Sequence, residues 1–332
     1  MLKIGVIGAG HLGKIHLKCL LELKEHFQVV GLYDIDPAVA LSASQQFNIQ
    51  PFISYQALLD AVDVLDIVTP TVTHFSLAKT AIEQAKHLFI EKPVTQTVEE
   101  AQALIALAQE HGVTVQVGHV ERFNPAMLAV RDVPMKPMFI EAHRLANFNP
   151  RGTDVPVVLD LMIHDIDIVL SLVKSPVKAV SASGVAVVSD SPDIANARIE
   201  FENGCVANLT ASRISMKQMR KVRLFQKDAY ISLDFLEKSA QVVRMHEPGS
   251  EPVGIPNFEL ETPGGNRVIS MEMPPAEPVN AIREELKALV VSILRSEKTA
   301  VTLEDGAAAL DVAWRMMNEI NNRTTGIPTN DL

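Results

Sequence analysis

Apolar residues in the first third of the chain occur in two alternating patterns. Short runs rich in β-branched residues, such as those that contain Ile4 and Val64, are typical of buried strands. Between them, apolar residues recur every three or four positions, which is the spacing of amphipathic helices. The predicted strands lie near 4–7, 29–33, 51–53, 64–68, 87–90 and 113–117, and the predicted helices near 15–20, 37–47, 55–61, 74–86 and 98–111. Strands that alternate with helices in this way form a parallel, doubly wound sheet.

Beyond about Pro134 the alternation gives way to a succession of strands. One helix interrupts it at 157–173, and Asn203-Gly204 between two alternating runs indicates a tight hairpin. The predicted strands lie near 138–147, 177–188, 195–201, 205–212, 221–226, 230–234, 240–245 and 267–273. The segment 246–265 contains Pro and Gly and is expected to be a loop, and helices at 279–295 and 303–322 follow it.

The two patterns predict an α/β chain with two domains. Residues 1–121 are expected to form the doubly wound parallel sheet, and residues 122–332 an α+β domain with a large open, mostly antiparallel sheet. The run 206–209 carries apolar residues at both alternating sets of positions, which predicts a homodimer or homotetramer built through this sheet. The terminal helices are the alternative cover for that face of the sheet.

The composition narrows the classes of protein and partner. Of 332 residues, 47% are hydrophobic and 21% charged, as in a soluble globular enzyme. A formal net charge of −10 argues against nucleic acid and an anionic membrane surface as partners. The two cysteines, Cys19 and Cys205, favour a reducing compartment, and no signal peptide is expected before the first strand. The apolar stretch 157–173 contains three aspartates and a histidine, so no membrane span is predicted and we expect a cytoplasmic protein.

Gly8, Gly10 and Gly13 form a G-x-G-x-x-G motif between the first strand and the first helix. In dinucleotide-binding domains, the first glycine allows the tight turn, the second lets the backbone approach a pyrophosphate, and the third lets helix and strand pack closely. The pyrophosphate then lies at the helix N-terminus, where unpaired N–H groups favour an anion. Asp34 follows the second strand at the distance expected for a carboxylate that binds the adenosine ribose. The first domain is therefore predicted to be a Rossmann domain.

Asp34 and Asp36 also bear on the choice of cofactor, because their charges would repel a 2′-phosphate. NAD is therefore favoured over NADP. Other ligand contacts are expected from the loops at the carboxyl ends of the later strands, where ligands of doubly wound sheets collect. The predicted cofactor-binding residues are Gly8, Ala9, Gly10, His11, Leu12, Gly13, Asp34, Thr69, Pro70, His74, Glu91 and Lys92.

Lys92 stands in Glu91-Lys92-Pro93, directly after a buried strand at the cofactor edge of the predicted sheet. Pro93 fixes the turn, which would direct Lys92 toward the substrate. A lysine in this place can hydrogen-bond a substrate hydroxyl and stabilise the negative charge that develops on its oxygen. The alternative is a solvated loop lysine that caps the next helix.

Asp160, His164 and Asp167 follow at spacings of four and three, along one stripe of an otherwise apolar helix. Ionisable groups in such surroundings are costly unless they are paired or functional. His164 suits proton transfer at neutral pH, and a histidine satisfied within the core is the alternative. Asp160 and His164 are also possible metal ligands, with His119 or His143 as a third. Oxidation of an alcohol by a nicotinamide needs no metal, so no metal is predicted.

Four motifs occur in order along the chain: Gly8-Ala-Gly-His-Leu-Gly-Lys-Ile-His16, Thr69-Pro70 with His74, Glu91-Lys92-Pro93, and Asp160-x-x-x-His164-Asp165. Together they resemble the Gfo/Idh/MocA oxidoreductases, the relatives of glucose–fructose oxidoreductase and inositol dehydrogenase. The resemblance runs the length of the chain. It implies that Lys92 and His164 are the catalytic pair and that Asp160 supports the substrate site. It also implies that the Lys92–Pro93 peptide is often cis.

The segment 117–126 resembles family members that act on nucleotide sugars, in particular the 3-dehydrogenases of UDP-N-acetylglucosamine. The implied reaction is hydride transfer between a sugar hydroxyl carbon and NAD. The alternatives are an inositol or free-sugar dehydrogenase, a keto-sugar reductase, and a non-catalytic NAD-binding regulator, which should have lost Lys92 or His164. For each arginine below, a surface ion pair is the alternative role. The predicted substrate residues are Arg122, Asn124, Arg144, Arg151, Asp160 and His164.

Overall fold

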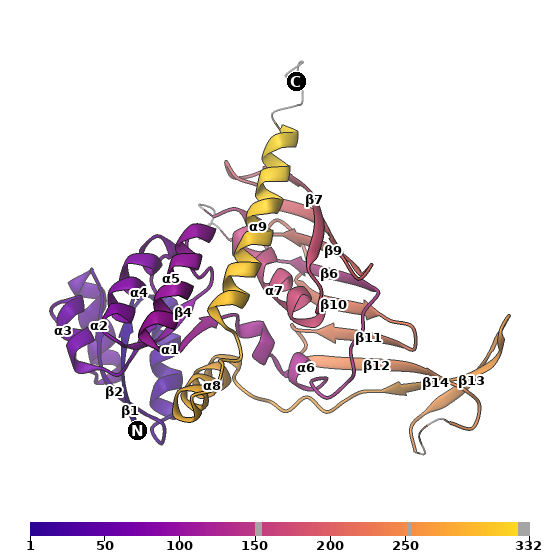
Figure 1. Cartoon of the computed structure of the whole chain (residues 1–332), viewed down its shortest axis with the longest axis horizontal. Coiled ribbons are helices and arrows are strands. Elements are labelled where there is room, and N and C mark those ends of the chain that lie inside the picture. Colours follow the sequence, from indigo (N-terminus) through magenta and orange to yellow (C-terminus); the bar gives the residue numbers. More distant parts are fainter. Residues whose placement is uncertain (150–154, 251, 253, 325–332) are drawn as a thin grey trace. The chain divides into compact units, whose positions relative to one another are not determined.

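The computed structural model describes residues 1–149, 155–250, 252 and 254–324 (Figure 1). The chain forms two compact units. The first unit contains residues 1–123 and 279–310, and the second contains residues 124–278 and the chain from 311 onward. Each unit is described by itself below. Among the described residues, no helix combines the length and the apolar character that a membrane crossing requires.

The first unit is built on a five-stranded parallel sheet in the order β2-β1-β3-β4-β5, which confirms the predicted doubly wound fold. Its strands are β1 (Leu2–Ile7), β2 (Phe27–Tyr33), β3 (Val64–Ile67), β4 (His87–Glu91) and β5 (Val115–Gly118). The connecting helices are α1 (His11–Glu22), α2 (Pro37–Phe47), α3 (Tyr55–Ala61), α4 (His74–Glu83) and α5 (Val98–His111). The predicted strand at 51–53 is only an isolated bridge between Pro51 and Leu32. Proline has no N–H to donate to a strand ladder, which disfavours a longer pairing there.

Helix α8 (Ala281–Arg295) belongs to the first unit although it follows the second sheet in the sequence. Its side chains Leu286 and Leu289 are buried in the same core cluster as the apolar residues of β1 and α1. The side-chain amide of Gln116 on β5 also donates a 2.6 Å hydrogen bond to the carbonyl of Glu285. The compact units therefore differ from the predicted division at 121/122, because the apolar face of α8 is buried in the first core.

The second unit contains a nine-stranded sheet in the order β13-β14-β12-β11-β10-β6-β9-β8-β7. Neighbouring strands are antiparallel except β6 and β9, so the predicted mostly antiparallel sheet is confirmed. Asn203-Gly204 forms the predicted hairpin between β8 and β9. The first strands are β6 (Phe139–Leu145), β7 (Val177–Val185), β8 (Ile194–Phe201), β9 (Val206–Ser212) and β10 (Met219–Phe225). They are followed by β11 (Ala229–Asp234), β12 (Ser239–His246), β13 (Asn257–Thr262) and β14 (Gly265–Glu272).

Strand β13 lies inside the segment predicted to be a loop. It pairs with β14 alone, at the end of the sheet farthest from β7 (Figure 1). Five of its six residues are exposed, so it has no buried face. A strand without a buried face lacks the alternation of apolar and polar residues that identifies strands in a sequence.

Helices pack against the second sheet. The short helix α6 (Pro125–Leu128) contacts β11 and β12, and α7 (Ile163–Leu172) contacts β6 and β9. The last helix, α9 (Leu303–Thr324), begins in the first unit and ends in the second. In the second unit, Ile320 of α9 packs over Gly184 of β7.

Candidate active site

The glycine motif forms the turn between β1 and α1. Gly8 has a φ of +90°, and a Cβ at this position would collide with the carbonyl of Val68. A Cβ on Gly13 would collide with the carbonyl oxygen of Gly8, so glycine lets α1 pack closely on the turn. A Cβ on Gly10 would meet no atom within 4 Å, which leaves open space beside the backbone. This is the arrangement that approach of a pyrophosphate requires.

Helix α1 begins at His11 without a side-chain cap, and His11 and Leu12 are exposed. Its first N–H groups therefore receive no acceptor from a capping side chain and suit an anion. Asp34 follows β2 beside this turn. Its Oδ2 accepts a 2.7 Å hydrogen bond from the N–H of Ala9, and its Oδ1 accepts a 2.9 Å bond from the N–H of Asp36. The residues present thus fit a dinucleotide, with a turn for the pyrophosphate and a carboxylate for a ribose.

The loop after β3 carries Thr69 and Pro70 and leads through the 3₁₀ turn η1 (Thr71–Thr73) to α4. His74, buried at the start of α4, has one ring nitrogen 2.9 Å from the carbonyl oxygen of Thr69 and the other 2.9 Å from that of Pro93. Burial lowers the pKa of His74, so the ring is neutral at pH 7 and donates to one carbonyl at a time. His74 therefore joins the loop after β3 to the turn after β4.

Lys92 follows β4, and the Lys92–Pro93 peptide is cis, as the family resemblance implied. The side chain of Lys92 is half-buried, and its backbone N–H donates a 3.1 Å hydrogen bond to Oε2 of Glu91. Glu91 pairs in register with Gly118 on β5. A Cβ on Gly118 would lie 2.9 Å from Oε1 of Glu91, so the glycine leaves room for the carboxylate.

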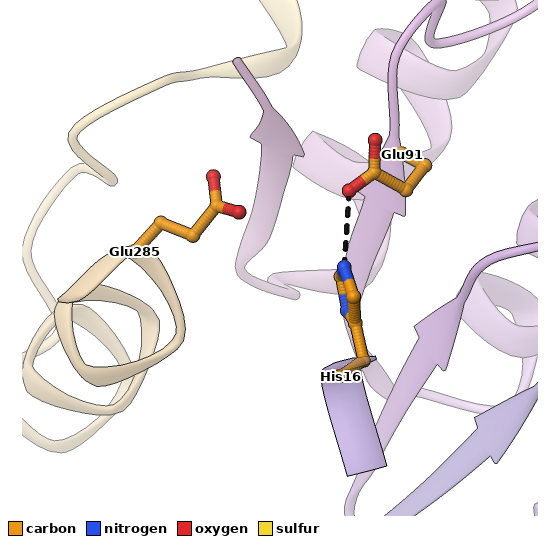
Figure 2. Close-up of side chains that lie close together, drawn as sticks. All are labelled: His16, Glu91 and Glu285. Atoms are coloured by element: carbon orange, nitrogen blue, oxygen red, sulfur yellow. Dashed lines mark ion pairs between the residues drawn. The ribbon is translucent and has the colours of Figure 1, made fainter. Parts of the chain in front are cut away.

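A cluster of ionisable side chains lies next to this turn, in the core of the first unit (Figure 2). Nδ1 of His16 on α1 lies 3.0 Å from Oδ2 of Asp66 on β3, and Nε2 lies 3.2 Å from Oε1 of Glu91. The carboxylate of Glu285 on α8 points toward His16 and Glu91 (Figure 2). The sequence predicted no role for His16, Asp66 or Glu285. An aspartate inside the apolar strand β3 was the available signal, because a buried carboxylate requires a partner.

In the second unit, the predicted helix at 157–173 consists of a π-helical turn, η3 (Val158–Met162), followed by α7. Such turns are frequent at functional sites, and their wider spacing shifts Asp160 relative to a regular α-helical stripe. Asp160 and His164 are half-buried, whereas Asp167 is buried. Arg213 is a further buried residue here that the sequence did not single out. It donates a hydrogen bond to the carbonyl of Val155, and its Nη2 lies 3.9 Å from Oδ2 of Asp160.

The predicted substrate residues near the end of the first unit have protein partners. Arg122, in the 3₁₀ turn η2 (Val120–Phe123), places Nη1 3.4 Å from Oδ2 of Asp305. Asn124 begins the second unit and caps α6, where its side-chain oxygen accepts from the N–H of Ala126. Its amide also donates a 3.0 Å hydrogen bond to the carbonyl of Phe235.

Arg144 lies on β6 and is buried. Its Nε and Nη2 donate hydrogen bonds of 3.0 and 2.8 Å to the two carboxylate oxygens of Asp165 on α7. This bidentate pair joins α7 to the sheet and engages the guanidinium within the protein. Arg151 lies outside the described residues.

The predicted residues thus form two sets, one in each unit. The carboxyl edge of the parallel sheet gathers the glycine turn, Asp34, His74 and the turn that carries Lys92. This set fits a dinucleotide, and Lys92 directly follows β4 at the same edge of the sheet. In the second unit, Asp160 and His164 lie on the consecutive elements η3 and α7, and both side chains are half-buried.

Family models match both units. Residues 2–119 match the oxidoreductase family with an NAD-binding Rossmann fold, and residues 139–231 match the GFO/IDH/MocA C-terminal domain. The chain is 40% identical over 261 residues to a UDP-N-acetylglucosamine 3-dehydrogenase of Acidithiobacillus ferrooxidans, which covers 78% of this chain and 82% of the relative. It is 30% identical over 233 residues to a scyllo-inositol 2-dehydrogenase (NAD(+)) of Bacillus subtilis, covering 64% and 68%.

A solved structure of the Acidithiobacillus ferrooxidans enzyme resembles this one with a TM-score of 0.86 at 33% identity. The alignment covers 97% of this chain and 98% of that one. The glycine turn and the turn that carries Lys92 indicate the same family as the two family models. The chain belongs to the Gfo/Idh/MocA family of NAD-binding oxidoreductases.

Proposed function

We propose that this protein is an NAD-dependent dehydrogenase that oxidises a ring hydroxyl of a nucleotide sugar such as UDP-N-acetylglucosamine, at carbon 3. The observation that carries the proposal is the turn of Lys92, which directly follows β4 at the edge of the sheet that holds the glycine turn. The identity of 40% to a UDP-N-acetylglucosamine 3-dehydrogenase supports the substrate class.

The proposed reaction removes a hydride from the carbon and a proton from its hydroxyl group, and each goes to a separate acceptor. When NAD is bound, its nicotinamide supplies the acceptor for the hydride that leaves the carbon. Lys92 donates a hydrogen bond to the hydroxyl oxygen and stabilises the charge that develops on it. His164 takes the hydroxyl proton as general base. Asp160 orients the sugar or His164, and the carbon becomes a ketone.

The preference for NAD rests on Asp34. Its carboxylate lies beside the N–H of Ala9 in the glycine turn, at the end of β2. A negative charge there accepts hydrogen bonds from ribose hydroxyls and repels a 2′-phosphate. The glycine turn with the N-terminus of α1, and the loops of Thr69–His74 and Glu91–Lys92, would hold the rest of the cofactor.

For the diphosphate of the substrate, the candidates remain Arg122, Asn124, Arg144 and Arg151. Arg144 is the least available of those described, because Asp165 already binds its guanidinium at two points. Oxidation of a free inositol is the second candidate function, supported by the 30% identity to a scyllo-inositol 2-dehydrogenase. A free polyol needs no diphosphate contact. Substitution of these arginines should therefore impair turnover of a nucleotide sugar but not of a free inositol, which distinguishes the two functions.

We also propose that the protein works as a homodimer or homotetramer assembled through the second sheet. Cys19 and Cys205 are buried free cysteines, as is usual in a reducing environment. They support the proposal that the protein acts in the cytoplasm. Size-exclusion chromatography with light scattering measures the oligomer directly.

The test of the function is formation of reduced nicotinamide from NAD with UDP-N-acetylglucosamine, other UDP-sugars, free hexoses and inositols. A carbonyl trap in each reaction removes the ketone and draws the equilibrium forward. We expect turnover with UDP-sugars, and Lys92→Ala and His164→Ala should each lower kcat about 100-fold or more. Lys79→Ala, an exposed lysine on the surface of α4, is the matched lysine control. Turnover with inositols alone supports the second candidate, and unchanged turnover in both variants contradicts the assigned roles.

A further inference from the structure

Four ionisable side chains meet in the core of the first unit, and the predicted cofactor site includes only Glu91. His16, Asp66 and Glu285 have exposed fractions of 0%, and Glu91 has 8%. They come from four different elements, α1, β3, α8 and β4. Figure 2 shows three of them, His16, Glu91 and Glu285. Three carboxyl groups and one imidazole therefore share a site that excludes water, so each sets the protonation of the others.

His16 is the centre of this cluster. Asp66 hydrogen-bonds Nδ1 of the ring at 3.0 Å, Oε1 of Glu91 lies 3.2 Å from Nε2 as an ion-pair contact without hydrogen-bond geometry, and the ring meets Phe89 edge-on. A ring with an acceptor at both nitrogens is bound best as the imidazolium, which carries a proton on each. Burial lowers the pKa of His16, but the charge and the hydrogen bond of Asp66, together with Glu91, outweigh burial and raise the pKa well above 6.5. His16 is thus a buried cation at neutral pH.

Glu91 connects the cluster to the turn that carries Lys92. Its Oε1 faces His16, and its Oε2 accepts the 3.1 Å hydrogen bond from the backbone N–H of Lys92. On the side of β5, Gly118 leaves room for this carboxylate, because any Cβ there would lie 2.9 Å from Oε1. The two oxygens of Glu91 are held between a ring in the core and the backbone of the turn. The carboxylate of Glu91 therefore lies between His16 and the backbone of Lys92.

We propose that His16 is a positioning residue for Lys92 and acts through the carboxylate of Glu91. The inference rests on the proposed function, because it takes Lys92 as the residue that contacts the substrate hydroxyl. Asp66 orients the ring from its Nδ1 side, as carboxylates commonly do for functional histidines. Helix α1 then serves twice, since its first residues form the cofactor turn and His16 supports the turn of Lys92.

A metal ion is the rival occupant of this cluster. One ligand atom from each of His16, Glu91 and Glu285 lies within 4.8 Å of the others, and neither oxygen of Glu285 has a hydrogen-bond partner among the described residues. A metal requires a deprotonated ring nitrogen, whereas carboxylates at both nitrogens favour the protonated ring. Burial, and then the charge of Glu91, raise the pKa of Glu285 well above 4.5. A proton on Glu285 therefore reduces the negative charge of the cluster without an ion.

The test compares His16→Leu and His16→Gln with His87→Gln as the matched control. His87 is half-buried at the opposite end of β4 from Glu91, where its Nδ1 accepts a 2.9 Å hydrogen bond from the N–H of Thr114. For each full-length variant, the measurements are kcat and KM for the sugar, NAD affinity, and amide hydrogen exchange across residues 91–96.

We expect His16→Leu to lower kcat about 10- to 100-fold, with little change in KM or NAD affinity. Exchange across residues 91–96 should become faster. His16→Gln keeps one N–H donor and should recover part of both losses, and it carries the comparison if the leucine variant does not fold. His87→Gln should leave kcat and this exchange unchanged.

Exchange across residues 91–96 that matches the wild type in the His16 variants would overturn the proposal. Parallel losses of kcat and NAD affinity would overturn it as well, because they indicate a general role in folding of the unit. So would a stoichiometric metal ion in the purified wild type that His16→Gln loses, measured by elemental analysis. The exchange measurement needs no substrate, so a wild type that oxidises no sugar refutes the proposed function and leaves this test intact.

Discussion

The two units bury charge in different ways. In the second unit, Arg144 and Asp165 are 3% and 2% exposed, and two parallel hydrogen bonds join one cation to one anion. In the first unit, the single ring of His16 faces the carboxylates of Asp66 and Glu91, with Glu285 close by. In the Arg144–Asp165 pair, the positive and negative charges cancel. The cluster around His16 has more carboxyl groups than cations, so its net charge approaches zero only when carboxyl groups are protonated. A balanced pair fixes one element against another, and an unbalanced cluster makes stability depend on pH.

The largest effect is expected from Arg144→Met, which leaves Asp165 buried without its partner. Breaking a buried ion pair from one side costs about 3–5 kcal/mol, whereas apolar replacement of both partners is often close to neutral. Urea unfolding of Arg144→Met and of the double variant with Asp165→Leu measures the difference. We expect the double variant to be the more stable of the two. A loss below about 1 kcal/mol in Arg144→Met, as for a surface pair, would contradict the anchoring role of the pair.

Asp193 sharpens the comparison, because neutral donors balance this buried carboxylate. Its Oδ2 accepts hydrogen bonds of 2.8, 2.7 and 3.1 Å from the N–H groups of Val187, Val188 and Ser189. Its Oδ1 accepts a 2.7 Å bond from the hydroxyl of Ser189. Burial raises the pKa of Asp193, but these hydrogen bonds outweigh burial and lower it to about 2.

The next largest effect is therefore expected from Asp193→Ala, which should lower the free energy of unfolding at neutral pH by about 1–3 kcal/mol. A lowered folded-state pKa gives stability that is present above the unfolded value of 3.8 and is lost as the pH falls through about 2. The difference between wild type and variant should thus shrink over that range in chemical unfolding. A constant difference at all pH values would mean that the ionised carboxylate is not what stabilises this loop.

The smallest effect, and one of opposite sign, is expected from Glu285→Gln. Because burial raises the folded-state pKa of Glu285, its contribution to stability is fully present below 4.5 and is lost as the pH rises through the folded value. The glutamine variant should match the wild type near pH 4.5 and become the more stable protein as the pH increases. Thermal unfolding from pH 4.5 to 9 measures this trend. A variant that is less stable throughout would indicate an ionised Glu285 with a bound cation.

The parallel sheet and the glycine turn were predictable because both depend on residues close together in sequence. Gly8 and Gly13 must be glycine because a Cβ at either position would collide with the turn itself or with the neighbouring loop. Likewise, Asn203-Gly204 marks its hairpin by local geometry alone. Strand β13 was missed for the same reason, since its exposed residues carry no alternation and only its pairing with β14 makes it a strand.

The candidate site was predictable as a set of residue types but not as a set of partners. Lys92 and His164 stand in recognisable motifs, and their catalytic roles remain predictions. For Arg144, a basic residue in the sequence is equally consistent with a diphosphate contact and with an ion pair. Its bond to Asp165 follows from the packing of α7 on β6, which residue spacing does not reveal. The π-helical turn at Val158–Met162 was also invisible, because its apolar sequence suits a regular helix as well.

Local sequence therefore determined the class of each unit and the glycine turn. These features follow from side-chain volume, backbone freedom and periodicity, all of which act over a few residues. The tertiary structure alone decided which charges meet. His16, Asp66 and Glu91 meet because α1, β3 and β4 pack together in the first unit, and Glu285 joins them because α8 packs into the same core. Electrostatic interactions depend on distance in space and on exclusion of water, and neither can be read from the order of residues.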